Sequence, residues 1–294
     1  MKTSKLILLI FSFIFFSCLS NNIIGQGNAP QKPKQDGVAL KLPGMEDVII
    51  KKDIPYLNTS ISTRIIDIYY PPKFDFKRNI PAVIFISGAA DTSMVKLVGS
   101  PFRKFSQYTS WCKIVAASGM AAIVYESSDP QNDLISLTNY INSDQSKLNI
   151  DKNKLGAFVC SGHTPTAISY ILNSSSIFKC AVLFYGFVLT QDFESNSTVE
   201  SMFKQMGFQR PPILTDPVSW KKDVSLLIVR AGQDKVPFVN QSIQTFLNIA
   251  IKQNLPITLI NYPDAPHSFD VSTDNGTTNM IISNTLEFWK QHLN

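Results

Sequence analysis

Short hydrophobic runs recur along the chain and alternate with longer segments whose hydrophobic residues fall on one helical face. Most of these runs contain almost no polar position, which indicates strands buried on both faces rather than half-exposed strands. The runs cover residues 82–87, 120–125, 155–159, 181–184, 226–229 and 257–260. Helical segments follow most of them, so the pattern predicts a mostly parallel central sheet with helices on both faces, an α/β fold.

Proline residues mark several of the boundaries between the predicted elements. An early strand over residues 61–70 ends at Pro71-Pro72, and no helix separates it from the next strand. These early strands therefore favour an antiparallel edge of the sheet. A helix is expected around residues 102–118. Another begins at Asp129-Pro130, because Asp can cap the exposed amides and proline at the first helical position loses no bond.

Two segments interrupt this rhythm. Residues 27–45 are rich in Pro, Gly, Gln and Lys and are typical of a leader or linker, which places the folded domain at residues 46–294. Residues 188–222 are polar and contain Pro211-Pro212. A long insertion of this kind is either a short cap over a functional site or a surface excursion, and both interpretations stay open.

Residues 1–26 have the layout of a signal peptide. Lys2 and Lys5 precede a hydrophobic run from Leu6 to Phe16, and about 11 residues are too few to span a bilayer. Cleavage near Gly25-Gln26 would release a soluble exported protein. The alternative is a bacterial lipoprotein signal, in which Cys18 carries a lipid anchor. Either processing route predicts an exported protein.

Composition narrows the class of protein. Hydrophobic residues make up 44% of the chain and charged residues 17%, as in a globular protein, and the formal charge is +5. Lysines and acids are interspersed, which argues against nucleic acid as a partner. Outside the signal peptide, Cys112, Cys160 and Cys180 have no disulfide-framework spacing. No motif for a metal or cofactor is present, and none is expected.

The strongest local signal is the segment from Leu155 to Pro165, in which a strand runs into a turn and then a helix. Ser161 lies at the turn, where its hydroxyl would project from the end of the strand. The amide of Gly162 would lie at the helix N-terminus, where it can stabilise an oxyanion.

These residues resemble the nucleophile elbow of the α/β-hydrolase superfamily, and more closely its dienelactone hydrolase and acetyl-esterase-like branches. The resemblance covers most of residues 48–292. Those families carry G-x-S-x-G or G-x-C-x-G, whereas this chain has Val159 and His163 in place of both flanking glycines. Cys160 is the alternative nucleophile. One residue earlier in the chain, it would point away from the apex of the elbow.

A serine nucleophile needs a base, and the base needs an orienting carboxylate. The resemblance implies that His267, in a loop after the last strand, is the base. It also implies that Asp234, in a Gly-x-Asp loop after the strand over 226–229, is the acid. An isolated Asp there is otherwise a helix cap before Pro237. His163 is expected to be a pocket or surface residue, because it lies too early in the elbow helix to reach the serine.

Two further positions complete the candidate site. The loop after residues 82–87 should supply the second oxyanion donor, which we place at the amide of Ala89, with Ala90 as the neighbouring alternative. Glu126 follows the strand ending at Tyr125 and points to the same edge of the sheet. It is either a pocket residue or a partner in a structural hydrogen bond.

Together these residues predict an exported serine hydrolase that cleaves carboxylic esters through a Ser161–Asp234–His267 triad. Its substrate would be a small-molecule or carbohydrate ester. Two alternatives remain: a peptidase resembling the catalytic domain of prolyl oligopeptidases, and a non-catalytic binding protein on a hydrolase scaffold. The unusual elbow flanks, Val159 and His163, support the second alternative.

Overall fold

A computed structural model of the chain describes residues 37–58, 63–143, 148–188, 201, 203–204, 207–208 and 217–293. The predicted signal peptide, Cys18 and most of the predicted leader lie outside these residues. So does most of the predicted cap-like insertion over 188–222. Residues 37–45 do belong to the folded body, although the sequence assigned them to the linker. Val38 is fully buried and its amide donates to Ser110 Oγ at 2.8 Å.

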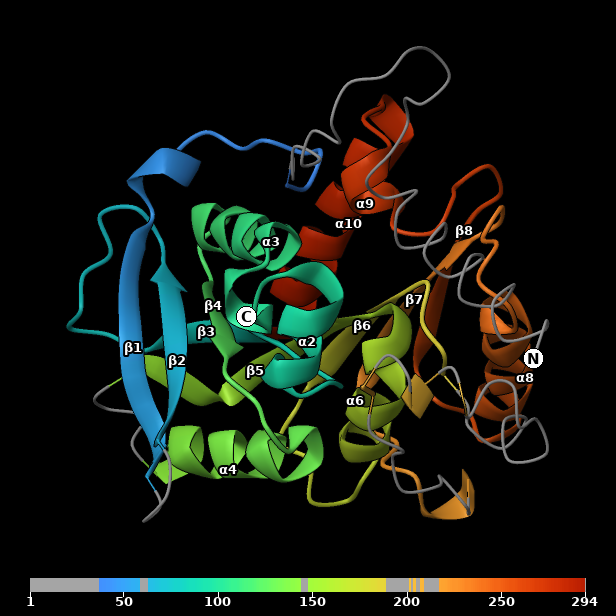
Figure 1. Cartoon of the computed structure of the whole chain (residues 1–294), viewed down its shortest axis with the longest axis horizontal. Helices are drawn as coiled ribbons and strands as arrows, with labels where there is room; N and C mark the ends of the chain where they lie inside the picture. Colours follow the sequence, from blue (N-terminus) through green and yellow to red (C-terminus); the bar gives the residue numbers. More distant parts are fainter. Residues whose placement is uncertain are drawn as a thin grey trace.

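Eight strands form one sheet in the order β1-β2-β4-β3-β5-β6-β7-β8 (Figure 1). Their bounds are Ile49–Asn58, Thr63–Tyr70, Ile80–Phe85, Ala121–Tyr125, Ile150–Cys160, Cys180–Phe184, Ser225–Ala231 and Ile257–Tyr262 for β1 to β8. The pairs β1–β2 and β2–β4 are antiparallel, and every pair from β4 to β8 is parallel. The mostly parallel sheet is as the sequence predicts.

The early strands differ in part from the prediction. β2 does belong to an antiparallel edge, but β3 lies inside the parallel part of the sheet. The reason is that β4 inserts between β2 and β3. β1 was not predicted, because Lys51, Lys52 and Asp53 are exposed and Pro55 interrupts its hydrophobic pattern.

Helices cover both faces of the sheet (Figure 1). One face carries α4 (Pro130–Ser143), α6 (Thr164–Ile171) and α8 (Val239–Lys252). The other carries α3 (Ser106–Ala117) and α10 (Gly276–Leu293), with the short α9 (Phe269–Ser272) beside α10. Two short segments, α2 (Asp91–Val98) and a 3-10 turn (Phe102–Lys104), connect β3 to α3.

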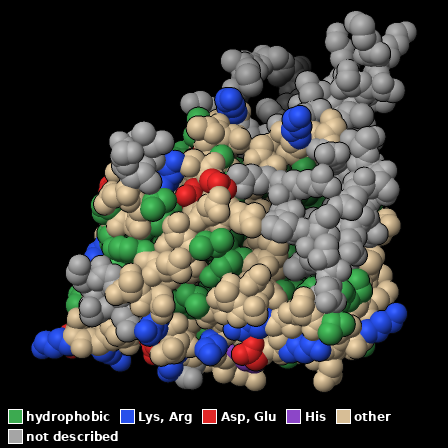
Figure 2. Space-filling view, turned by 90° about the horizontal axis from the view of Figure 1, so that it is seen from below, with side chains coloured by type: hydrophobic (Ala, Val, Ile, Leu, Met, Phe, Trp, Pro, Cys, Tyr) green, Lys and Arg blue, Asp and Glu red, His purple; other side chains and the backbone are tan. Residues whose placement is uncertain are grey.

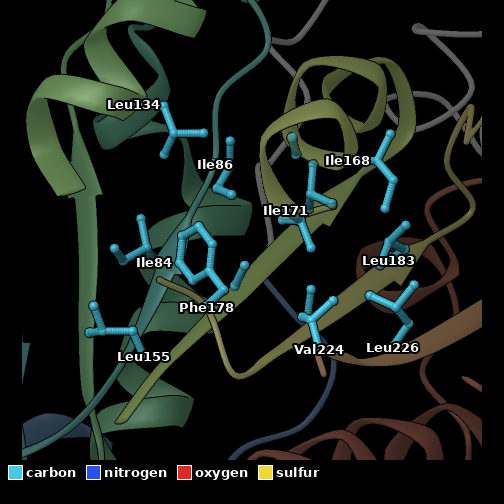
Figure 3. Packing of buried hydrophobic residues seen from close by; sticks show 14 of the residues in the cluster. Ile84, Ile86, Leu134, Leu155, Ile168, Ile171, Phe178, Leu183, Val224 and Leu226 are labelled. Atoms are coloured by element: carbon cyan, nitrogen blue, oxygen red, sulfur yellow. The ribbon is translucent and has the colours of Figure 1, made fainter. Parts of the chain in front are cut away.

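Two hydrophobic clusters fill the spaces between the sheet and its helices. Alternate residues of each strand point to opposite faces, so Ile84 joins the α4 and α6 side while Val83 and Phe85 join the α3 and α10 side. Figure 3 shows the first cluster, in which Phe178 lies among aliphatic side chains of the sheet and helices. This two-sided burial explains why the central strands are hydrophobic at almost every position.

The start of α4 shows a different cap from the predicted one. Proline is the first helical residue, as expected, but the exposed amides of Ser128 and Asp129 donate to Asp133 Oδ2 at 2.7 and 2.9 Å. The carboxylate of the fourth helical residue therefore accepts from the amides that precede the helix, one residue later than in a capping box. Asp129 instead accepts a side-chain bond from Asn132.

The surface carries no single concentration of basic residues on the face shown in Figure 2. There, Lys and Arg side chains are spread around the outline and hydrophobic side chains lie towards the middle. In the part of the chain that the structure describes, no helix has the length and hydrophobicity needed to cross a bilayer.

Candidate active site

Ser161 lies at a sharp turn between β5 and α6. Its backbone has φ 51°, in the left-handed region, which a non-glycine residue rarely adopts. Such a conformation costs on the order of 1–3 kcal/mol and persists where the surrounding structure enforces it. The turn places the serine at the end of β5, followed by a 3-10 turn over residues 161–163 that leads into α6.

A hydrogen-bond relay extends from this serine. Ser161 Oγ lies 2.9 Å from His267 Nε2, and His267 Nδ1 lies 2.7 Å from Asp234 Oδ2. The Asp234 side chain is fully buried, and 14% of the His267 side chain is exposed. A neutral histidine with its proton on Nδ1 donates to the carboxylate and leaves Nε2 to accept from the serine, the arrangement of a general base.

The loops that carry His267 and Asp234 are joined by backbone hydrogen bonds. The amides of Gly232 and Gln233 donate to the carbonyls of Tyr262 and Ala265 at 2.8 and 2.9 Å. A Cβ at Gly232 would lie 2.1 Å from the carbonyl oxygen of Pro263, so only glycine allows this approach. The sequence left open whether Asp234 is only a helix cap. In the structure, α8 begins at Val239 and Asp234 Oδ1 accepts from the Val236 amide.

Beneath the histidine lies a buried polar cluster that the sequence did not reveal. The ring of Tyr185, just after β6, is 4.7 Å from the His267 ring. Its hydroxyl donates to Asp270 Oδ1 at 2.5 Å, and Trp111 Nε1 donates to Asp270 Oδ2 at 2.8 Å. Gln107 Nε2 donates to both Tyr185 and Asp270. Burial and the nearby Asp270 charge raise the pKa of Tyr185 well above its ordinary value.

The sequence positions of Tyr185 and Asp270, two members of this cluster, could have revealed them. Tyr185 follows a strand that lies between the strands of Ser161 and Asp234, so its side chain belongs at the same edge of the sheet. Asp270 follows His267 by three residues, within reach of the same site. Neither Tyr185 nor Asp270 belongs to a sequence motif, because the hydrogen bonds of this cluster depend on the packing of α3 against the sheet.

The predicted oxyanion loop, residues 87–91, is anchored to the end of β4 and to the elbow. The Ser87 amide donates to Tyr125 Oη at 3.3 Å, the Gly88 amide to His163 Nδ1 at 2.8 Å, and the Asp91 amide to the Ser127 carbonyl at 2.8 Å. The Ala89 amide makes one long bond, 3.4 Å to Ser87 Oγ. The bonds from Ser87, Gly88 and Asp91 therefore hold the loop in place on both sides of the two alanines.

Gly162 follows the serine and lies against Phe208. A Cβ at Gly162 would lie 2.6 Å from two atoms of the Phe208 ring, closer than carbon atoms approach. Phe208 also pairs with Ala89 in an isolated antiparallel bridge. An aromatic residue of the 188–222 insertion therefore contacts both positions assigned to the oxyanion hole.

The remaining predicted residues lie outside the relay. Cys160 is buried in the α3-side cluster, with Sγ 3.4 Å from Tyr108 Oη. Glu126 accepts from Arg103 Nε at 3.0 Å, in a network in which Arg103 also contacts Asp53 and Asp67. This is the structural hydrogen bond that the sequence offered as an alternative to a pocket role.

Of the two positions expected for His163, in a pocket or at the surface, the structure excludes the surface. His163 is 5% exposed, and burial lowers its pKa to about 3. The reason is that the turn after Ser161 directs its ring inward, beneath the oxyanion loop. In the described ranges, no cluster of three or more His, Cys, Asp or Glu side chains has an arrangement suited to a metal ion.

Comparison with solved structures yields matches over most of the chain. Esterase B from Lactobacillus rhamnosis, in an inhibited form, has a TM-score of 0.61 and 14% identity, covering 84% of this chain and 88% of that protein. Apo esterase 2 from Thermogutta terrifontis has a TM-score of 0.60 and 16% identity, covering 85% and 96%. Its tabun-modified form has a TM-score of 0.59 and 17% identity, covering 85% and 94%. This chain has an α/β-hydrolase fold.

Neither a protein-family model nor a curated protein matches the chain. Within the α/β-hydrolase fold, Ser161, Asp234 and His267 lie after β5, β7 and β8, and the carboxyl ends of these parallel strands meet at one edge of the sheet. That shared edge is why residues more than 100 positions apart in the chain come within hydrogen-bond distance.

Proposed function

We propose that the protein is an exported serine hydrolase that cleaves carboxylic esters with Ser161, His267 and Asp234 as its catalytic triad. The observation that carries the proposal is the relay of 2.9 and 2.7 Å bonds that ends at a serine in a strained strand–turn–helix elbow. A structural role for Ser161 would not require left-handed backbone or a buried carboxylate behind its histidine partner.

In the first half of the reaction, His267 Nε2 takes the proton from Ser161 as Oγ attacks the ester carbonyl. Asp234 orients the ring and stabilises the imidazolium that forms. The Gly162 amide lies in the first turn after the elbow, where amides have no intrahelical partner, and it donates to the developing oxyanion. The second donor comes from the loop at Ala89 and Ala90.

In the second half, His267 returns its proton to the leaving alcohol and an acyl group remains on Ser161. Water then enters, loses its proton to the same nitrogen and attacks the acyl carbonyl. Collapse of the second tetrahedral intermediate breaks the bond to Ser161 Oγ and releases the carboxylic acid, and His267 returns its proton to Oγ. The residues described above supply each proton transfer in this sequence.

The neighbouring solved structures support this choice of reaction, because they are esterases and several of them carry phosphonate or organophosphate inhibitors. We propose that the protein is most similar to the dienelactone hydrolase and acetyl-esterase-like branch, because the loops around Asp234 and His267 resemble those of that branch. A small-molecule or carbohydrate ester is the proposed substrate class.

We also propose that the protein is exported. Lys2, Lys5 and the hydrophobic run that follows them support a signal peptide. Cys18 is the site at which a lipid anchor would be attached if the signal is processed as a lipoprotein.

Hydrolysis of a series of p-nitrophenyl esters tests the reaction. The wild-type protein should hydrolyse short acyl chains, and Ser161→Ala should lower kcat by about 10⁴-fold or more, because the nucleophile is lost. Ser169→Ala on α6 is a matched control, since its hydroxyl donates within the helix, at 2.8 Å to the Thr166 carbonyl. Cys160→Ala tests the alternative nucleophile and should retain activity.

A dipeptide panel separates esterase from peptidase. Faster turnover of Xaa-Pro or other dipeptide substrates than of esters would favour the peptidase alternative. If the folded wild-type protein neither hydrolyses esters nor reacts with a fluorophosphonate, the non-catalytic binding protein becomes the better interpretation.

A further inference from the structure

His163 occupies the position two residues after the candidate nucleophile, where the resemblance to hydrolases leads one to expect glycine. The elbow nevertheless forms, and the small residue needed for its tight packing lies on the facing loop instead. A Cβ at Gly88 would lie 2.7 Å from His163 Cα and 2.9 Å from its carbonyl oxygen. The backbones of the oxyanion loop and the elbow therefore touch at Gly88 and His163.

The imidazole adds a directed bond to this contact. The Gly88 amide donates to His163 Nδ1 at 2.8 Å, joining two residues that are 75 positions apart. Of the amides from Ser87 to Asp91, this one makes the shortest bond to a side chain. This bond fixes the Gly88 amide, which directly precedes the Ala89 and Ala90 amides assigned to the oxyanion. It therefore constrains the direction in which those two amides point.

An aromatic enclosure holds the imidazole in place. The rings of Phe102, Phe208 and Tyr108 have centroids 5.2, 5.1 and 6.0 Å from it, each close to perpendicular or steeply inclined. Because this enclosure excludes water, it disfavours the imidazolium form and lowers the pKa of His163 to about 3. The ring is thus neutral, which leaves Nδ1 able to accept and places the proton on Nε2.

We infer that His163 is a positioning residue of the oxyanion hole, which aims the Ala89 and Ala90 amides by fixing Gly88 through its Nδ1 atom. This inference rests on the proposed ester hydrolysis. His163 stands where the resemblance leads one to expect glycine, and that departure otherwise argues against catalysis. The bond from Gly88 to His163 gives the histidine a function at this position.

Three substitutions separate this role from simple packing. His163→Asn keeps an acceptor at the same number of bonds from Cβ as Nδ1, whereas His163→Gln places its acceptor at the depth of Nε2. His163→Leu removes the acceptor and keeps a hydrophobic side chain. His292→Asn is a control at a partly exposed histidine on α10.

Steady-state hydrolysis of p-nitrophenyl acetate is measured for each variant, with active sites counted by fluorophosphonate titration and folding checked by thermal melting. Loss of one oxyanion donor costs about 10²–10³ in kcat. We therefore expect the Leu and Gln variants to lose about tenfold or more in kcat with KM changed little, and Asn to retain most of kcat. Equal kcat per active site in Leu, Gln and wild type would overturn the inference, as would equal losses in Asn and Leu.

A measurement on the wild-type protein covers the case in which variants fail to fold. Imidazole ¹⁵N NMR should show His163 neutral with its proton on Nε2 and an unprotonated Nδ1. A proton on Nδ1 would contradict the bond from Gly88. If the wild type is inert towards both the ester and the fluorophosphonate, the proposed function fails. The NMR result tests the His163–Gly88 bond in either case.

Discussion

The contact between Gly162 and Phe208 restricts which residue can follow the nucleophile in the elbow. There is no room for even a methyl group at residue 162, because the Phe208 ring occupies it. The Gly162 backbone does not adopt a positive φ, so its need for glycine comes from packing rather than from conformation. A substitution there can therefore be rescued from the other side of the contact.

Gly162→Ala should destabilise the fold by about 1–3 kcal/mol through overpacking, and should lower ester hydrolysis as the ring is pushed towards the oxyanion loop. Adding Phe208→Leu should recover much of both losses, because a smaller side chain makes room for the methyl group. A double-mutant cycle in urea measures the coupling. Strictly additive effects of the two substitutions would contradict the contact.

His163 also gives the folded state a pH dependence. Its pKa is about 3 in the folded protein and 6.5 as an ordinary histidine, so between these values the unfolded chain binds the extra proton. The free energy of unfolding should therefore fall as pH drops from about 6.5 towards 3. The limiting slope from this group is about 1.4 kcal/mol per pH unit.

His163→Asn cannot take up that proton, so its stability should depend less steeply on pH over this window. Urea denaturation of both proteins at pH 4, 5, 6 and 7 gives the comparison. If the unfolding free energies of the two proteins changed in parallel with pH, His163 would bind protons equally in the folded and unfolded states.

The catalytic candidates could be predicted from the sequence because each follows a recognisable strand. Ser161, Asp234 and His267 come after hydrophobic runs, and the ends of parallel strands share an edge. The partners of His163 and Tyr185 could not be predicted in this way. Their bonds join residues 75 and 85 positions apart, and no local pattern marks either end.

At the scale of elements, the buried Asp270 carboxylate connects α3, the end of β6 and α9. It accepts bonds from Tyr185, Trp111 and Gln107 and is fully buried. Since the Tyr185 ring contacts His267, this cluster couples the packing of α3 to the candidate base. The elements around the site are therefore held by one charge-assisted network.

Asp270→Ala should lower the free energy of unfolding by about 3 kcal/mol or more, because it leaves buried donors without an acceptor. Asp264→Ala is a matched control, since Asp264 is exposed on the loop that precedes α9. Chemical denaturation measures both variants. A loss below about 0.5 kcal/mol for Asp270→Ala would show that water or a shifted side chain replaces the carboxylate.

The central strands could be predicted because burial on both faces makes them hydrophobic throughout, as β4 and β6 show. The edge could not. β1 is charged and partly exposed, and nothing local indicates that β4 pairs between β2 and β3. Pairing order depends on long-range packing, which hydrophobic periodicity does not encode.

At the scale of the whole molecule, the folded body begins before the predicted domain boundary, since Val38 and Ala39 bond to α3 and α9. A signal peptide that ends at residue 26 would leave this packed segment intact. Export and folding are therefore compatible with either processing site.

Expression of the full chain in a bacterial host, followed by fractionation and mass spectrometry of the N-terminus, tests export. Cleavage near Gly25-Gln26 predicts a soluble mature protein. Lipoprotein processing predicts a membrane-bound protein that begins at a lipidated Cys18 and becomes soluble in Cys18→Ser. An uncleaved cytoplasmic chain that retains Lys2 and Lys5 would contradict both routes.

The most direct test of the proposed chemistry is to identify the residue that a fluorophosphonate modifies. The folded wild-type protein is labelled, digested and mapped by mass spectrometry. We predict one adduct, on the peptide that contains Ser161, and its absence from Ser161→Ala. An adduct on another residue, or no adduct on the folded protein, would contradict a Ser161 nucleophile.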